Sequence, residues 1–166
     1  MKKHELFIDF DGVILDTITP SYKYMEMLGE NPTDEEKKEF FEHYPWKNLI
    51  QDKYILNNSI YAIQKLIDSD KFYISVLTHV NSLNEAVIKV KYLRKFFKDL
   101  TIIPVPKSIS KTNMVHTEDA ILVDDYTENL KEWKKAGGIG VKFSAKMKEP
   151  KDFPVIDNLL TLIDMF

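Results

Sequence analysis

Short apolar runs alternate with longer segments of mixed polarity along the 166-residue chain. The first run, residues 6–8, suits a buried strand, and two aspartates and a glycine follow it closely. From residue 72 onward, apolar runs of strand length alternate with segments of helical period, which favours a parallel α/β sheet covered by helices on both faces. The later strands are expected at 72–77, 101–105, 120–123 and 139–143. Pro104 places the strand at 101–105 at an edge of the sheet.

Residues 14–70 contain no convincing strand and show helical signals instead. One helix is expected over 17–28. A second should begin at Thr33, because Glu36 stands three residues later, which is the spacing of a capping box. A third is expected over 57–67, where isoleucines recur on one helical face.

Three later helices are also expected, one of them over 126–136, where Gly137 and Gly138 end it. The sequence Ser82-x-x-Glu85 opens another. Its core-facing stripe contains Ala86, Val90, Leu93 and Phe97. Its basic residues fall mainly on the other side and are interpreted as a solvated face: Lys89, Lys91, Arg94, Lys95 and Lys98. The apolar residues of the closing helix are Ile156, Leu159, Leu160 and Ile163.

Composition narrows the function classes. The formal net charge of −3 implies no general attraction to a nucleic acid polymer. The absence of cysteine excludes disulfides, thiolate catalysis and cysteine-based zinc sites. Asp9 interrupts any apolar signal segment near the start, and no apolar run approaches the roughly 20 residues of a membrane helix. We therefore expect a cytoplasmic protein without membrane or nucleic acid partners.

Polar side chains follow several of the predicted strands. Asp9 and Asp11 are two residues apart and point the same way if the strand persists. Thr78 and the pair Asp124-Asp125 end two other strands. Taken alone, Asp9 and Asp11 could be solvated aspartates before a turn. The carboxyl ends of parallel strands, however, meet at one edge of the sheet, where ligands bind, so we expect these polar residues to form one site. Clustered carboxylates are costly to bury without a cation, so we expect a Mg²⁺ site.

Four motifs in this order resemble those of the haloacid dehalogenase-like (HAD) superfamily, over nearly the whole chain. DFDGV at 9–13 matches the first motif, the threonine of VLTHV the second, a lysine at 107 or 111 the third, and ILVDD at 121–125 the fourth. The resemblance implies a Rossmann-like core with a five-stranded parallel sheet, formed by residues 1–13 and 71–166. It also implies that residues 14–70 form a small helical cap.

The resemblance further implies a Mg²⁺-dependent phosphatase that works through an aspartyl-phosphate. Asp9 would be the nucleophile and a metal ligand. Asp11 would act as general acid and base, and its backbone carbonyl would contact Mg²⁺. Asp124 would be a further metal ligand, with Asp125 as a ligand or a supporting partner. Thr78 would hydrogen-bond a phosphate oxygen.

The lysine of the third motif is either Lys107 or Lys111. We favour Lys111, because it follows Ser110 where a helix is expected to begin, whereas Lys107 lies closer to the third strand. Its ammonium would neutralise phosphate charge. His79 is a weaker candidate for a catalytic base, since Asp11 already has that role, but its backbone amide could help to hold phosphate.

The substrate is expected to be a small phosphorylated metabolite. DFDGV, the short cap, LTHV and ILVDD followed by TENL resemble the 5′(3′)-deoxyribonucleotidases. Trp46, outside the predicted helices, is a candidate for stacking on a flat leaving group. A sugar phosphate or another phosphomonoester is the alternative. The non-enzyme alternatives are a receiver-like regulatory domain and a catalytically silent module. The order of residues argues against the receiver domain, in which the lysine follows the last acidic residue, because here the lysine precedes Asp124.

Overall fold

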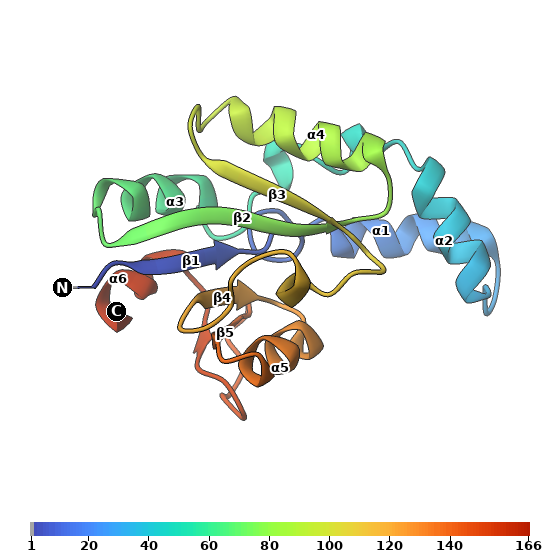
Figure 1. Ribbon diagram of the computed structural model, residues 1–166. Helices are drawn as coiled ribbons and strands as arrows, with labels where there is room; N and C mark the ends of the chain where they lie inside the picture. Colours follow the sequence, from blue (N-terminus) through green and yellow to red (C-terminus); the bar gives the residue numbers. More distant parts are fainter. Residues whose placement is uncertain (1) are drawn as a thin grey trace.

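The computed structural model describes residues 2–166, which contain a six-stranded sheet in the order β3-β2-β1-β4-β5-β6 (Figure 1). All neighbouring strands pair in parallel. The strands are β1 (His4–Ile8), β2 (Phe72–Val80), β3 (Thr101–Pro106), β4 (Ile121–Asp124), β5 (Ile139–Phe143) and β6 (Val155–Ile156). This confirms the parallel Rossmann-like α/β fold and the edge position of β3. Residue 1 of the predicted core segment 1–13 lies outside the described residues.

The sheet has six strands where we predicted five, and the additional strand is β6. Its two residues, Val155 and Ile156, pair with Lys142 and Phe143 of β5. The prediction placed Ile156 in the closing helix, but the helical part is the short turn η5 (Leu159–Thr161) followed by α6 (Leu162–Met165). A strand of two residues has no alternation that a pattern could reveal, so its apolar residue was assigned to the helical stripe beside it.

Both faces of the sheet are buried. Leu6 and Ile8 belong to a core cluster on one face, with residues of α3 (Ser59–Asp68), α4 (Leu83–Arg94) and α6. Phe7 points to the other face, where it packs edge-on against Trp133 of α5 (Thr127–Lys135), with ring centroids 5.4 Å apart. Alternation of side chains along β1 explains this division. In Figure 1, α3 and α4 lie on the opposite side of the strands from α5.

A helical segment projects beyond the carboxyl end of β1 (Figure 1). We call residues 18–48 the cap segment. Its elements are α1 (Ile18–Met25), η1 (Glu26–Leu28), α2 (Asp34–His43) and η2 (Trp46–Asn48). The capping box at the start of α2 is confirmed, since Thr33 Oγ1 accepts from the amide of Glu36 and the Glu36 carboxylate accepts from the amide of Thr33.

The predicted insertion 14–70 also contains η3 (Asp52–Tyr54) and α3. The helix α3 does not project, because its buried Ala62, Ile63 and Leu66 pack into the core cluster of the sheet. The division of the chain into a core and a cap at 14–70 stays a prediction. Within residues 2–166, no helix is long and apolar enough to cross a membrane.

Candidate active site

The carboxyl ends of three adjacent strands bring the predicted polar residues together. Ile8, the last residue of β1, is paired with Val76 of β2 and Val123 of β4, and the amide of Asp9 donates to the carbonyl of Val123 at 2.9 Å. The strand order reverses between β1 and β4, which is where open parallel sheets bind their ligands. Asp9 and Asp124 are therefore neighbours at this edge, and both are buried.

Lys111 lies between these two carboxylates. Its Nζ donates to Asp9 Oδ1 and to Asp124 Oδ2, each at 2.8 Å. It begins the turn η4 (Lys111–Asn113), where the Oγ of Ser110 accepts from the amide of Thr112. Burial lowers the pKa of Lys111, but the two carboxylates outweigh this and raise the pKa, so the side chain stays an ammonium. Lys107 is exposed and makes no such contact.

Three carboxylates form a group that suits a divalent cation. Asp9, Asp124 and Asp125 each offer an oxygen, and these atoms lie within 4.8 Å of one another. Burial and then Asp124 raise the pKa of Asp9 well above its usual value. Burial and the same neighbour raise the pKa of Asp125 to about 7. A hard cation would relieve this repulsion, and the all-oxygen donor set fits Mg²⁺.

Gly12 permits the approach of Asp125. A Cβ built on Gly12 would lie 2.2 Å from Asp125 Oδ2, and the φ of Gly12 is +74°. Any other residue would meet both a steric clash and a strained backbone. The glycine of the DFDGV motif is thus required by the acidic group as well as by the turn.

The carboxylate of Asp11 points to other partners. Its Oδ1 accepts from Thr17 Oγ1 and its Oδ2 accepts from Lys89 Nζ, both at 2.6 Å. Burial raises the pKa of Asp11, but Lys89 and Thr17 outweigh this and lower the pKa below its usual value. The side chain of Asp11 is therefore not part of the cluster formed by Asp9, Asp124 and Asp125.

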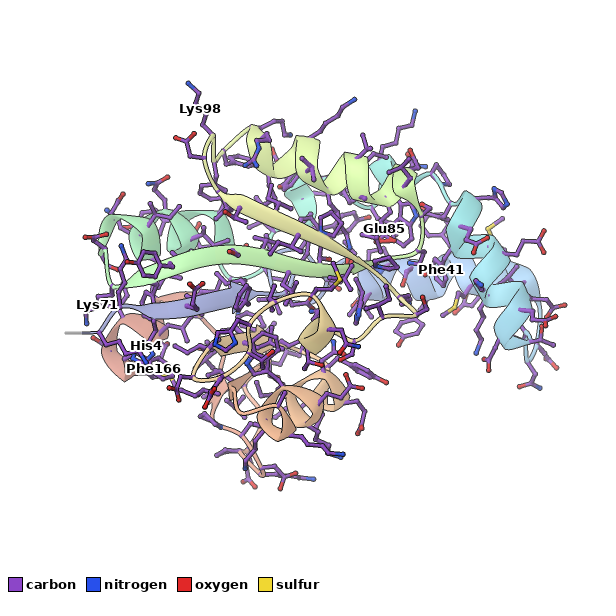
Figure 2. The ribbon with its side chains drawn as sticks, viewed as in Figure 1. His4, Phe41, Lys71, Glu85, Lys98 and Phe166 are labelled. Atoms are coloured by element: carbon purple, nitrogen blue, oxygen red, sulfur yellow. The ribbon has the colours of Figure 1, made fainter. Side chains whose placement is uncertain are left out.

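Lys89 corrects our interpretation of the basic residues on α4. We predicted a solvated lysine, but Lys89 is fully buried. The buried residues of α4 are Glu85, Ala86, Lys89, Tyr92 and Leu93. The predicted stripe used Val90, which is only half-buried. Figure 2 shows Glu85 between α4 and the strands, whereas Lys98 points outward. One feature of the sequence could have indicated that Lys89 is buried. Lys89 stands four residues after Glu85, on the same helix face as the apolar Ala86 and Leu93.

Two further predicted residues lie at the end of β2. Thr78 is fully buried, and its Oγ1 accepts from Lys89 Nζ at 2.9 Å. The ring Nε2 of His79 lies 2.8 Å from the carbonyl oxygen of Ile109. Burial lowers the pKa of His79, which favours the neutral ring. The contacts made by the His79 side chain are thus directed at the β3–η4 connection.

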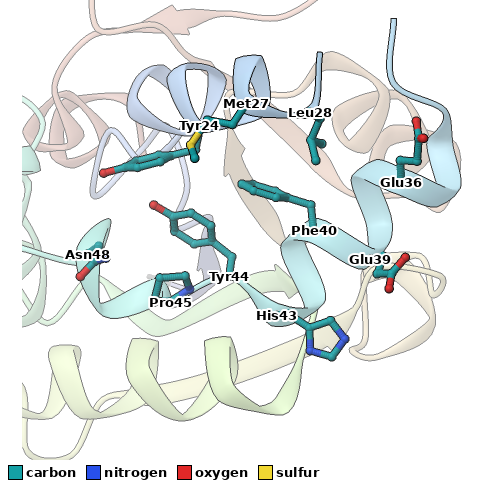
Figure 3. A pocket seen from close by; sticks show the side chains of 10 residues that line it. All are labelled: Tyr24, Met27, Leu28, Glu36, Glu39, Phe40, His43, Tyr44, Pro45 and Asn48. Atoms are coloured by element: carbon teal, nitrogen blue, oxygen red, sulfur yellow. The ribbon is translucent and has the colours of Figure 1, made fainter. Parts of the chain in front are cut away.

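Trp46 is placed in an aromatic cluster of the cap segment. It is buried, stacks on Phe41 with ring centroids 5.8 Å apart, and packs edge-on against Tyr44 at 5.5 Å. Its Nε1 donates to the carbonyl of Phe41 at 3.0 Å. This packing leaves little of the indole for a leaving group. Beside the cluster is a cavity of ≈570 Å³ between α1 and α2, with walls that include Tyr24, Phe40 and Tyr44 (Figure 3).

Comparisons with known proteins identify the fold. No family model matches the chain, and no curated protein matches it in sequence. Among solved structures, the chain is similar to the magnesium-bound HAD-hydrolase YfnB of Bacillus subtilis, with a TM-score of 0.65, 17% identity and 99% of both chains covered. A hydrolase from Pseudomonas syringae gives a TM-score of 0.69 at 13% identity, covering 98% of this chain and 97% of the other.

A further similar structure is the D,D-heptose 1,7-bisphosphate phosphatase of B. bronchiseptica, complexed with magnesium and phosphate. Its TM-score is 0.54 at 16% identity, and 97% of each chain is covered. At these identities the likeness establishes the HAD fold, over nearly the full length of each chain.

Proposed function

We propose that this chain is a HAD-type, Mg²⁺-dependent phosphatase that hydrolyses a small phosphomonoester through an aspartyl-phosphate. The main support is the surroundings of the buried Asp9 carboxylate, at the end of β1. It contacts the Lys111 ammonium at 2.8 Å, and its oxygen lies within 4.8 Å of oxygens of Asp124 and Asp125. A carboxylate nucleophile beside a fixed cation and an acidic metal-binding group is the set that phosphoryl transfer requires.

In the first step, the Asp9 carboxylate attacks phosphorus as the bond to the leaving oxygen breaks. Asp11, in its protonated form, supplies the proton that the leaving oxygen needs. Lys89 and Thr17 lower the pKa of Asp11 and so favour the carboxylate, which is the form required as base in the second step. In the second step, Asp11 takes a proton from water, which attacks the aspartyl-phosphate and releases inorganic phosphate and free Asp9. Lys111 and the hydroxyl of Thr78 bind the phosphate oxygens and stabilise their charge.

Mg²⁺ would be held by the carboxylates of Asp9, Asp124 and Asp125 and by the backbone carbonyl of Asp11. When bound, it would neutralise negative charge between the attacking carboxylate and the phosphate. The raised pKa values of Asp9 and Asp125 support this assignment, because these carboxylates ionise fully only with more positive charge nearby.

The substrate class we propose is a nucleoside monophosphate, with the leaving group in contact with the cap segment. The aromatic walls of the cap cavity, Tyr24, Phe40 and Tyr44, support a flat leaving group better than the buried Trp46 does. The volume of this cavity, ≈570 Å³, is within the usual range of small-molecule pockets. A sugar phosphate is the second candidate, because a heptose bisphosphate phosphatase has a similar fold.

The test of the activity is turnover of an aryl phosphate with Mg²⁺ and with excess EDTA, by wild type and by Asp9→Asn. We expect metal-dependent release of phosphate by wild type and none by the variant. Acid-quenched wild type should carry phosphate on Asp9. Full activity in chelator, or an active and folded Asp9→Asn protein, would contradict the proposal. A panel of deoxynucleoside monophosphates and sugar phosphates then decides the substrate class by comparison of kcat/KM.

A further inference from the structure

We propose that Lys89 is a positioning residue that holds Asp11 in place for proton transfer. This inference rests on the proposed function, because Asp11 matters to catalysis only as the proton carrier for a reacting phosphate. The structural basis is a fully buried ammonium 2.6 Å from Asp11 Oδ2. The helix α4 supplies this ammonium, and none of the four motifs includes it.

Lys89 is held by three other acceptors. Its Nζ lies 2.8 Å from Glu85 Oε2, 2.9 Å from Thr78 Oγ1 and 3.0 Å from the carbonyl oxygen of His79. An ammonium has three N–H donors, so the four oxygens including Asp11 satisfy it completely. A buried lysine without such partners would lose its proton or destabilise the fold. These contacts hold the ammonium in one position, next to the carboxyl ends of β1 and β2.

Glu85 anchors the lysine to the start of α4. Only 1% of Glu85 is exposed, and its Oε1 accepts from the amide of Asn81 at 2.9 Å and from Asn81 Nδ2 at 2.8 Å. Its Oε2 is left for Lys89, four residues later on the same helix face. Both charges lie inside the protein. Removing both charges from water costs free energy, and a solvent-exposed lysine on α4 would not incur that cost.

The effect on Asp11 is geometric. Asp11 lies in the loop after β1, and 27% of its side chain is exposed. Thr17 holds one carboxylate oxygen at 2.6 Å and Lys89 holds the other at 2.6 Å. Two contacts, one to each oxygen, fix the rotation of the group. A displacement of about 1 Å from the reacting atoms can cost ~10²-fold in rate, so loss of one contact should be severe.

The experiment is a double-mutant cycle with Lys89→Met and Asp11→Asn. The control is Lys91→Met, because Lys91 is an exposed lysine on the same helix. The rate of phosphoenzyme formation is measured with an aryl phosphate and with an alkyl phosphate, whose poor leaving group depends on protonation. We expect Lys89→Met to lower the alkyl rate by ~10²-fold and the aryl rate far less. In the Asp11→Asn background, Lys89→Met should change either rate by less than about 3-fold. Lys91→Met should match wild type.

The outcomes separate this inference from the proposed function. Equal losses with both substrates, or the same loss in both backgrounds, would assign Lys89 a structural role and overturn the inference while the phosphatase stands. A wild type inactive on every phosphomonoester would overturn the proposed function itself. If Lys89→Met unfolds because Glu85 is left unpaired, Lys89→Met/Glu85→Gln carries the same comparison. Failure of both variants to fold would also assign Lys89 to stability.

Discussion

The ammonium nitrogen of Lys111 lies 2.8 Å from Oδ1 of Asp9, although 102 positions separate the two residues in the sequence. The same nitrogen contacts Asp124 at 2.8 Å, so one lysine links the ends of β1 and β4. Under the proposed function, this buried, fixed charge would stabilise the oxygens of a phosphate that reacts with Asp9.

We predict that Lys111→Ala lowers kcat/KM for an aryl phosphate by ~10²–10³-fold, the usual cost of removing a fixed donor from a transition state. Lys107→Ala should leave the rate within about 3-fold of wild type, because Lys107 is exposed and lies outside the carboxylate cluster. Steady-state kinetics on both variants, with circular dichroism as a check of folding, measures the difference. The reverse ranking would assign the third motif to Lys107.

Asp11→Asn should separate the two chemical steps. An activated aryl phosphate needs little help from a general acid, so the variant should still form phosphoenzyme. Its breakdown needs a base for water, and this step should be slowed most. We therefore expect phosphate to accumulate on Asp9 in quenched samples of Asp11→Asn. A steady state equal to that of wild type would contradict the assigned role of Asp11.

How far the site could be predicted depends on the kind of signal each residue carries. Asp9 and Asp124 end apolar strands, and parallel strands bring their ends together, so local pattern was enough to predict that they meet. The choice of Lys111 over Lys107 used a helix-start position, and the structure places Lys111 among the carboxylates. In these cases the strand or turn itself determines where the side chain lies.

For Lys89 the local signal was weaker, a spacing of four from the buried Glu85, and the two-residue strand β6 had none. A lysine on an amphipathic helix is usually solvated, and burial of Lys89 depends on an oxygen of Asp11, which is 78 positions away in the sequence. The strand β6 exists because it pairs with β5, through the amides of Lys142 and Ser144 bonded to the carbonyls of Pro154 and Ile156. Long-range contacts therefore decided both features.

Gly12→Ala should impair both folding and activity. The new Cβ would lie 2.2 Å from Asp125 Oδ2, at a residue whose φ is +74°. Strain at such a position costs roughly 1–3 kcal/mol, and displacement of Asp125 should also weaken Mg²⁺ binding. We expect a lower melting temperature and a higher Mg²⁺ concentration for half-maximal activity. Gly29→Ala is the control, since it has a positive φ but no atom within 4 Å of the new Cβ.

Trp46→Ala should mainly destabilise the cap segment. Removal of a buried tryptophan typically costs about 3–5 kcal/mol, and here the hydrogen bond to the carbonyl of Phe41 is lost as well. We expect a lower melting temperature and similar losses of activity on a nucleotide and on an aryl phosphate. Trp46→Phe should recover much of the stability. A rise in KM for the nucleotide alone, at unchanged stability, would instead support direct stacking on Trp46.

The hydroxyl of Tyr44 is buried without a hydrogen-bond partner among the described residues. Tyr44→Phe removes that unsatisfied group, so we expect the free energy of unfolding at neutral pH to rise by up to about 1–3 kcal/mol. Tyr92→Phe is the matched control, because its hydroxyl donates to Asp52 Oδ1 at 2.8 Å and its loss should be destabilising. Denaturant titrations of the three proteins measure both changes.

The same residue predicts a dependence on alkaline pH. Burial, with Tyr24 nearby, raises the pKa of Tyr44 above its usual value, so the folded state favours the neutral phenol. Its contribution is complete below the unfolded pKa of about 10 and is lost as the pH rises toward the higher folded pKa. Wild type should therefore lose more stability than Tyr44→Phe between about pH 9 and pH 11. Parallel curves for the two proteins would show that Tyr44 ionises as freely in the folded protein as in the unfolded chain.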